Sequence, residues 1–223
     1  MGTVMIPFFA PLLLEDTMKT LIADVPVSVE HQKIFEGFGL NVFFASQLTE
    51  SLLSFPEWRQ FNPETTLLVF PGNGSQILRE FIPQSWLNTW NYTSVHAKRF
   101  WEPGQDPHVY TERIFTNRVI VGITDVVIVD DVISSGLTCR KIRAINRPWL
   151  ANVRWHAATW IKQKNAGMKG FSSVFSALTV GTNTRRVPII SLSTLLSDTV
   201  IARSFAARNI DDSHAFLDAL SSL

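Results

Sequence analysis

The sequence predicts an α/β protein built on a mostly parallel, doubly wound sheet. Strand-like apolar segments alternate along the chain with segments of helical spacing, which is typical of parallel sheets with crossover helices. Residues 126–129 are an unbroken run of branched apolar residues, as expected for a strand covered on both faces. Residues 66–70 and 126–129 are each followed by a glycine-containing turn and then by a helical pattern, which indicates strand–helix units.

The composition indicates one compact domain with a small annex. The chain has 223 residues, of which 46% are hydrophobic, and its formal net charge of +1 gives no bulk attraction to nucleic acid or to an anionic membrane. Cys139 is the single cysteine, which excludes an internal disulfide and fits a reducing cytosol. The apolar run 4–14 contains prolines, lacks a basic leader and is too short to span a bilayer. We therefore expect a cytoplasmic protein with neither nucleic acid nor membrane as a partner.

The N-terminal third contains a separate sub-region followed by a strand–helix unit. Residues 20–29 look extended, and residues 45–61 have the apolar spacing of a helix that Pro56 bends or ends. The apolar run 66–70 predicts a strand. After it, the Pro-Gly-Asn-Gly turn leads into a helix that is expected to open near Ser75.

The remaining elements continue this alternation. Residues 92–100 predict a strand, residues 101–113 a loop, and residues 118–131 an extended segment whose second half is buried. A helix over residues 135–146 should end before Pro148, and residues 153–163 and 171–180 predict two more strands. The C-terminal stretch from residue 211 predicts a helix with capping aspartates. We expect a core over residues 61–180, flanked by residues 1–60 and 181–223.

Two aspartates and a hydroxyl-rich segment follow the buried strand. Asp130 and Asp131 should project to opposite sides of that strand, where carboxylates can accept hydrogen bonds from sugar hydroxyls or bind Mg²⁺. The stretch from Ser134 to Thr138 opens a helix, and a helix N-terminus binds phosphate. A sugar diol and a phosphate one turn apart describe a ribose 5-phosphate. The alternative is a solvated turn with an ordinary serine N-cap.

The segment 126–138 also resembles the phosphoribosyl pyrophosphate (PRPP) signature of the type I phosphoribosyltransferases. It departs from that pattern only at Ser135, where the family usually has threonine and the hydroxyl is retained. The resemblance implies that Asp130 and Asp131 bind the ribose hydroxyls, directly or through Mg²⁺. The residues that it assigns to the 5-phosphate are Ser134, Ser135, Gly136, Leu137 and Thr138. It implies a parallel core with a small additional domain, here formed by the N- and C-terminal segments, and a homodimer.

The same resemblance implies a pyrophosphate loop one strand–helix unit upstream. The residues at that place are Pro71, Gly72, Asn73 and Gly74. The two glycines permit unusual backbone angles and the asparagine tolerates the left-handed region, although an ordinary turn is the alternative. The loop lacks the basic residue usual in the family.

A lid over the reacting ribose and a base site complete the implied active site. Lys98 and Arg99 precede a Pro/Gly-containing loop and could pair with pyrophosphate, with Arg113 as a further candidate. Trp160 could stack on a base and Lys162 donate to an exocyclic oxygen, the alternative being a core tryptophan and a surface lysine.

The sequence therefore predicts a Mg²⁺-dependent phosphoribosyltransferase of nucleotide metabolism. Its substrates would be PRPP and a nucleobase-like acceptor, the kind of base remaining open. Two alternatives are a non-catalytic PRPP sensor on the same fold and an unrelated nucleotide- or metal-binding α/β protein.

Overall fold

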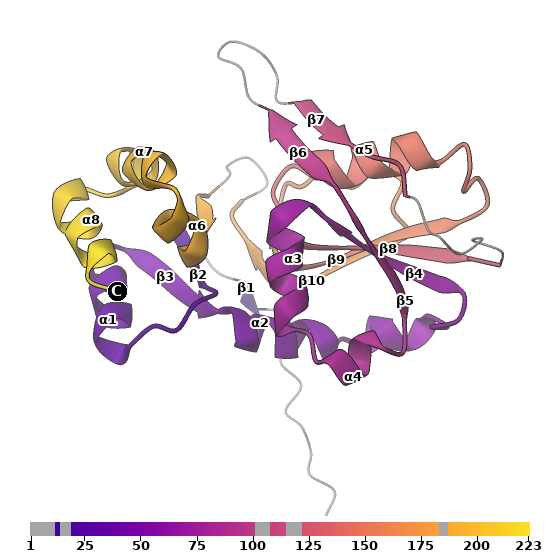
Figure 1. Ribbon diagram of the computed structural model, residues 1–223, viewed down its shortest axis with the longest axis horizontal. Helices are drawn as coiled ribbons and strands as arrows, with labels where there is room; N and C mark the ends of the chain where they lie inside the picture. The colour runs from indigo at the N-terminus through magenta and orange to yellow at the C-terminus, as the bar shows by residue number, and fades with distance from the viewer. Residues whose placement is uncertain (1–11, 14–18, 101–107, 115–121, 183–186) are drawn as a thin grey trace, which may run out of the picture.

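The main sheet of the computed structural model is entirely parallel (Figure 1). The structure describes residues 12–13, 19–100, 108–114, 122–182 and 187–223. The strands of the main sheet, in spatial order, are β1 (Leu12–Leu13), β10 (Ser173–Val180), β9 (Arg154–Gln163), β8 (Asp125–Ile133), β4 (Thr66–Pro71) and β5 (Asn91–Val95). The predicted fold class is thus confirmed.

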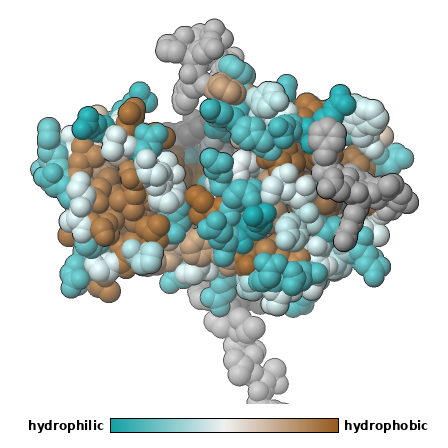
Figure 2. Space-filling model, in the orientation of Figure 1, coloured by the Kyte–Doolittle hydropathy of each residue, from teal (hydrophilic) through white to brown (hydrophobic). Residues whose placement is uncertain are grey.

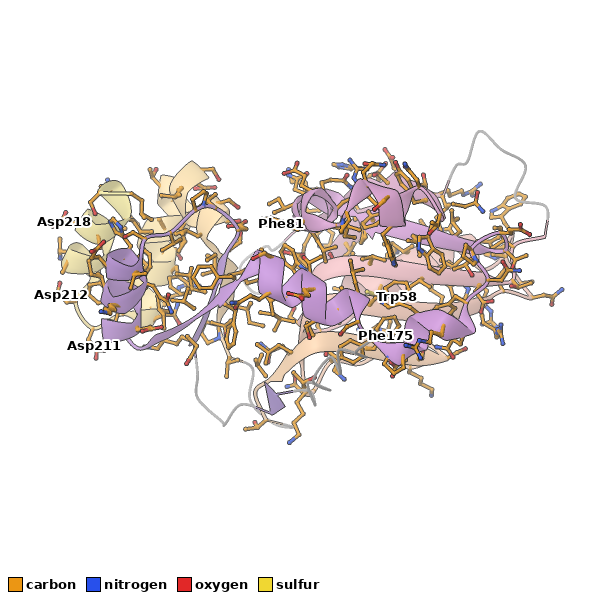
Figure 3. The ribbon with its side chains drawn as sticks, turned by 90° about the horizontal axis from the view of Figure 1, so that it is seen from below. Trp58, Phe81, Phe175, Asp211, Asp212 and Asp218 are labelled. Atoms are coloured by element: carbon orange, nitrogen blue, oxygen red, sulfur yellow. The ribbon has the colours of Figure 1, made fainter. Side chains whose placement is uncertain are left out.

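Helices cover both faces of this sheet, because its central strands are apolar on both sides. Residues 126–129 of β8 are at most 1% exposed. The helices α2 (Ala45–Leu53) and α3 (Gly72–Phe81) pack on one face, and α5 (Leu137–Asn146) packs on the other. Trp58, in the 3₁₀ helix η1 (Pro56–Gln60), fills the first face, with its ring centroid 5.0 Å from that of Phe175 (Figure 3).

A second, smaller sheet joins segments from the two ends of the chain. Its order is β11 (Ile189–Ser191), β2 (Lys19–Ala23) and β3 (Leu40–Phe44), and it lies to the left of the main sheet in Figure 1. The helices packed around it are α1 (Val29–Gly37), α6 (Leu192–Ser197), α7 (Thr199–Asn209) and α8 (Ser213–Ser221). We call residues 19–44 and 187–223 the hood. Apolar side chains gather on its face in Figure 2, although its own core encloses Leu21, Phe35 and Phe216 completely.

The expected domain boundary at residue 60 is wrong. Ala45, Leu48 and Leu52 of α2 and Trp58 of η1 belong to the apolar cluster on the main sheet. Helix α2 packs mainly against β9 and β10, and to a lesser extent against β3 of the hood. Residues 45–60 are therefore part of the core, and the hood segment at the N-terminus ends with β3.

Several predicted element boundaries also differ from the structure. Ser28 caps α1 by accepting from the His31 backbone N–H at 3.1 Å, so the extended segment ends earlier than expected. The predicted strand 92–100 is interrupted at His96 and continues as β6 (Ala97–Phe100). Part of the predicted loop 101–113 is a strand, β7 (His108–Thr111), which pairs antiparallel with β6. The short helix α4 (Gln84–Leu87) precedes β5.

A polar cluster around the buried Asp125 fixes β8 against β9 at the amino ends of both strands. The Asp125 carboxylate accepts from the Arg154 guanidinium at 2.8 and 2.9 Å and lies 3.0 Å from His156 Nε2. Burial by itself raises the pKa of Asp125, but hydrogen bonds from Arg154, Thr124 and His156 outweigh it and leave that pKa below its ordinary value. Burial lowers the pKa of His156, which favours the neutral ring. This cluster lies at the sheet edge opposite the site described next.

Candidate active site

A pocket of about 740 Å³ lies at the carboxyl edge of the main sheet, between the sheet and the hood. Ligands of doubly wound sheets bind beyond this edge. The main-sheet side is lined by Pro71, Gly72, Asn73, Gly74, Ala97, Arg99, Asp130, Asp131, Val132, Ser134, Thr138 and Gln163. The hood side is lined by Val187, Pro188, Ile189, Arg208 and Asn209.

The two carboxylates predicted from the sequence both reach this pocket, from opposite faces of β8. Asp130 shares its face with Val126 and Ile128, which pack in the cluster with α5, whereas Asp131 shares its face with the residues packed on α3. The sequence predicted that the strand ends at the two aspartates, but β8 continues to Ile133. Strand alternation therefore places one carboxylate beside each of the two following helices.

Ionisation of both carboxylates is unfavourable at this position in the protein. The pKa of Asp130 lies well above its ordinary value, mainly because the group is buried and also because the Asp131 carboxylate is adjacent. Burial likewise raises the pKa of Asp131. The Asp131 N–H donates to Asp130 Oδ1 at 3.1 Å, and Arg99 offsets part of the charge. A cation or a pair of sugar hydroxyls would relieve this repulsion, so the donor set fits either.

Two helix N-termini face the pocket beside these carboxylates. Helix α3 begins directly after β4, and α5 begins after the turn that follows β8; β4 and β8 are neighbours in the sheet. Neither N-cap residue, Pro71 nor Gly136, supplies a side-chain capping hydrogen bond. In α5 the Leu137 N–H donates to Ser135 Oγ at 3.2 Å, but no side chain of the described residues caps the other first N–H groups of the two helices, and the helix dipole adds positive potential there. This arrangement can hold two phosphate groups, one on either side of the carboxylates.

The predicted turn over residues 71–74 is the first turn of α3, which begins at Gly72 and not near Ser75. Gly72 has φ +65°, and a Cβ there would lie 2.8 Å from the Ala97 carbonyl oxygen. A Cβ at Gly74 would lie 2.4 Å from the Asp131 carboxylate. Gly72 thus provides the left-handed backbone, and Gly74 permits close approach of the aspartate. Among the described residues only glycines have positive φ, so Asn73 does not use the left-handed region.

The predicted 5-phosphate segment is held from behind by contacts that the sequence did not reveal. Ser134 and Thr138 line the pocket, whereas Ser135, Gly136 and Leu137 do not. Gly136 has φ +70°, and a Cβ there would lie 2.7 Å from the Gly167 carbonyl oxygen. Arg140 donates to the carbonyl oxygens of Ser135, at 2.8 Å, and Gly167. These contacts fix the turn before α5 against the segment that follows β9.

The two predicted lid residues, Lys98 and Arg99, lie on opposite faces of the β6–β7 hairpin, because neighbouring side chains in a strand alternate. Arg99 lines the pocket, and its Nη1 donates to Ser134 Oγ at 3.4 Å. Lys98 faces outward, with Nζ 5.4 Å from the centroid of the Phe100 ring. Arg113 lies over the Trp149 ring instead of in the pocket. Residues 101–107 of the predicted lid lie outside the described residues.

This division predicts that Arg99→Ala lowers turnover, whereas Lys98→Ala leaves it nearly unchanged. Of these two side chains, only that of Arg99 faces the pocket, where its guanidinium can pair with a phosphate oxygen. Melting temperatures and steady-state rates of both variants, measured with any active acceptor, check this expectation. Equal losses in the two variants would remove the special role of Arg99.

The predicted base-stacking role of Trp160 is wrong. Trp160 is 1% exposed, its Nε1 donates to Thr49 Oγ1 at 2.8 Å, and its ring packs against Phe81. It is a core residue beneath α2 and α3, as the alternative reading of the sequence had it. Lys162 is partly exposed but does not line the pocket, whereas the next residue, Gln163, does.

The hood residues at the pocket were missed by sequence reasoning. Val187, Pro188 and Ile189 enter the pocket only because β11 pairs with β2, far away in the sequence. Arg208 and Asn209 come from the end of α7. No local motif marks them, since their placement depends on how the two ends of the chain pack together.

Metal and membrane features are limited in the described part of the chain. No group of three or more His, Cys, Asp or Glu side chains there could hold a metal ion. A cation at Asp130 and Asp131 would need further oxygen ligands from water or substrate, which is usual for Mg²⁺.

None of the helices described is both long and apolar enough to cross a membrane.

Comparison with known proteins finds similarity only at the level of solved structures. No protein-family model matches the chain, and no curated protein matches it. The structure is similar to a xanthine-guanine-hypoxanthine phosphoribosyltransferase from Helicobacter pylori, with 16% identity, a TM-score of 0.48, and coverage of 70% of this chain and 93% of that one.

Two further solved structures show the same level of similarity. A purine phosphoribosyltransferase from Pyrococcus horikoshii has 14% identity, a TM-score of 0.42, and coverage of 65% of this chain and 87% of that one. An orotate phosphoribosyltransferase from Aeropyrum pernix has 14% identity, a TM-score of 0.39, and coverage of 60% and 71%.

Proposed function

We propose that the protein is a phosphoribosyltransferase that moves ribose 5-phosphate from PRPP to a nitrogenous base and releases pyrophosphate. One observation carries the proposal: the N-termini of α3 and α5 face the pocket on either side of two carboxylates, the buried Asp130 and the half-buried Asp131. PRPP has the matching groups, a ribose diol between a 5-phosphate and a pyrophosphate. The PRPP-like signature over residues 126–138 points to the same ligand.

In this proposal the residues mainly position the substrate and stabilise charge. Asp130 and Asp131 hold the ribose hydroxyls, Ser134 and Thr138 hold the 5-phosphate with the N-terminus of α5, and the N-terminus of α3 holds the pyrophosphate. The bond between C1′ and the pyrophosphate oxygen breaks, with its electron pair leaving on the pyrophosphate. The acceptor nitrogen supplies the pair for the new bond to C1′, and a proton carried by that nitrogen passes to solvent. Fixed dipoles and Arg99 stabilise the departing negative charge.

Mg²⁺ is part of the proposal because two repelling carboxylates favour a divalent cation. When bound, the ion would neutralise charge on the pyrophosphate and help to orient the ribose. Asp130 and Asp131 are the residues that would hold it. The homodimer implied by the family resemblance stays a prediction.

A screen of common purines and pyrimidines with PRPP and Mg²⁺, followed as pyrophosphate release, tests the proposed function. We expect hypoxanthine and guanine to be poor acceptors. Enzymes of the resembling family that use them usually carry an aspartate where this chain has Ser134, and a serine hydroxyl is too weak a base to exchange the purine N7 proton near neutral pH. Preference for hypoxanthine or guanine would show that Ser134 has been misread. PRPP binding without pyrophosphate release from any acceptor would favour the sensor alternative.

A further inference from the structure

The hood side of the pocket offers a place for the acceptor. If Asp130 and Asp131 hold the ribose, an acceptor that attacks C1′ must lie between these carboxylates and the hood. The wall there consists of Val187, Pro188 and Ile189. These apolar residues provide a surface for one face of a ring but no charge, so the polar groups around them decide which ring is preferred.

Gln163 holds this wall in place through hydrogen bonds that use both ends of its side-chain amide. Its Nε2 donates to the Val187 carbonyl oxygen at 2.6 Å, and its Oε1 accepts from the Val187 N–H at 3.3 Å. The side chain is nearly completely buried. Neither end of the amide is therefore free to bond the acceptor, and the role of Gln163 is to position the wall.

The two remaining polar residues on the hood side of the pocket, Asn209 and Arg208, differ in whether the protein itself occupies their side chains. Asn209 Nδ2 donates to the Phe205 carbonyl oxygen at 2.8 Å, within the last turn of α7. Arg208 is exposed and forms no ion pair with another described residue. Arg208 and Arg99 are the two cations that line the pocket among the described residues, and Arg99 already contacts the 5-phosphate segment through Ser134. The Arg208 guanidinium is thus the cation on the acceptor side.

Neither the helix end nor the neighbouring aspartates of the hood account for this charge. A cation in the last turn of a helix commonly compensates the helix dipole. Here, however, Lys19 Nζ already donates to the Asn209 carbonyl oxygen at the end of α7. Asp211 and Asp212 lie at the end of the hood away from the main sheet (Figure 3), and Asp212 caps α8 by accepting from the Ala215 N–H at 3.0 Å. Asp24 of the hood accepts from the backbone N–H and hydroxyl of Ser193.

We propose that the acceptor is a planar ring that bears a carboxylate, which Arg208 binds while the ring lies against Val187, Pro188 and Ile189. A guanidinium is the side chain best suited to a carboxylate, since its parallel N–H donors match the two oxygens. This inference rests on the proposed transferase function and narrows its substrate class.

Two pairs of acceptors test this inference, and in each pair the two molecules share a ring but only one bears a carboxylate. They are orotate against uracil and nicotinate against nicotinamide, each assayed with PRPP and Mg²⁺ by pyrophosphate release. We expect the carboxylated member of at least one pair to react, with a kcat/KM at least tenfold above that of its neutral partner. Arg208→Ala should lower kcat/KM for that acceptor by about 10- to 100-fold, the equivalent of one lost charge-assisted hydrogen-bond pair. Arg208→Lys, which keeps the charge but not the fork, should recover part of the loss.

The matched control is Arg203→Ala, which removes an exposed arginine from the same helix but outside the pocket. It should leave all rates unchanged. PRPP affinity, measured by calorimetry without an acceptor, should be unchanged in both alanine variants. Reaction with neutral acceptors only, or equal loss in the Arg208 and Arg203 variants, would overturn the carboxylate inference and leave the transferase function standing. Absence of PRPP binding in the wild-type protein would instead overturn the function, and the inference with it.

Discussion

Replacing both Asp130 and Asp131 by asparagine is expected to abolish PRPP binding and, at the same time, to stabilise the ligand-free protein at neutral pH. Charge-assisted hydrogen bonds contribute about 1.5–3 kcal/mol each, so losing both carboxylates should weaken binding by roughly two to four orders of magnitude. Asparagine is nearly isosteric, and its Oδ1 can still accept from the residue 131 N–H, as Asp130 Oδ1 does at 3.1 Å. The fold should therefore be retained.

The expected gain in stability follows from the direction of the pKa shifts. Burial raises the pKa of both aspartates in the folded protein, and repulsion by Asp131 adds to the shift at Asp130. The contribution of the two carboxyl groups to folding stability is most favourable below their unfolded-state pKa of about 4, where they are protonated in both the folded and the unfolded protein. This contribution is lost as pH rises through the folded-state pKa values. At neutral pH, above the unfolded-state value, the wild-type protein carries this penalty, whereas the double variant does not.

Melting temperatures at pH 4 and pH 7 and calorimetric titration with PRPP check both halves of the prediction. The double variant should melt higher than the wild type at pH 7 and show a smaller difference at pH 4; each kcal/mol corresponds to about 2–4 °C in a domain of this size. Asp125→Asn is the control of opposite sign. The pKa of Asp125 lies below its ordinary value, because hydrogen bonds from Arg154, Thr124 and His156 outweigh burial. This variant should lose stability at pH 7 and bind PRPP normally. A destabilised double variant, or one with unchanged PRPP affinity, would contradict the assignment of the pair.

Gly74→Ala is expected to weaken PRPP binding strongly with little loss of stability. The new Cβ would lie 2.4 Å from the Asp131 carboxylate, which is the free end of a side chain and can rotate away. Alanine within a helix is favoured over glycine by about 1 kcal/mol, which offsets part of the crowding. The carboxylate would leave its position beside the N-terminus of α3, so we expect PRPP affinity to fall by about tenfold or more, as for one charge-assisted hydrogen bond.

Gly72→Ala provides the contrast. Its Cβ would lie 2.8 Å from the carbonyl oxygen of Ala97, a backbone atom, and its φ of +65° is unfavourable for alanine. This variant should lose about 1–3 kcal/mol of stability, as is typical of overpacking. Urea unfolding and calorimetry separate the two effects. If Gly74→Ala bound PRPP as tightly as the wild type does, the close contact between α3 and Asp131 would have no role in binding.

The sequence predicted the parts of the site that local patterns encode. A run of branched apolar residues predicts β8, and the two aspartates and the serine-glycine segment after it lie at the pocket as strand alternation and helix starts require. The glycines in the first turn of α3 predicted a special backbone, although of the two only Gly72 has a positive φ and Gly74 permits close packing.

The incorrect and missing parts depend on tertiary packing. Trp160 looked suitable for stacking on a base, but α2 and α3 bury it, and the sequence could not show that α2 belongs to the core. Arg208 carries no local signal, because only the pairing of β11 with β2 brings the hood to the pocket. Lys98 and Arg99 looked equivalent until the pairing of β6 with β7 assigned them opposite faces.

Calorimetric titration of the wild-type protein with PRPP, ribose 5-phosphate and pyrophosphate, each with Mg²⁺, tests the central claim most directly. If the N-termini of α3 and α5 and the carboxylates between them form one site, PRPP should bind with one-to-one stoichiometry and at least tenfold more tightly than either fragment. The two fragments should each compete with it. Failure to bind PRPP, or PRPP binding no tighter than pyrophosphate alone, would contradict the account.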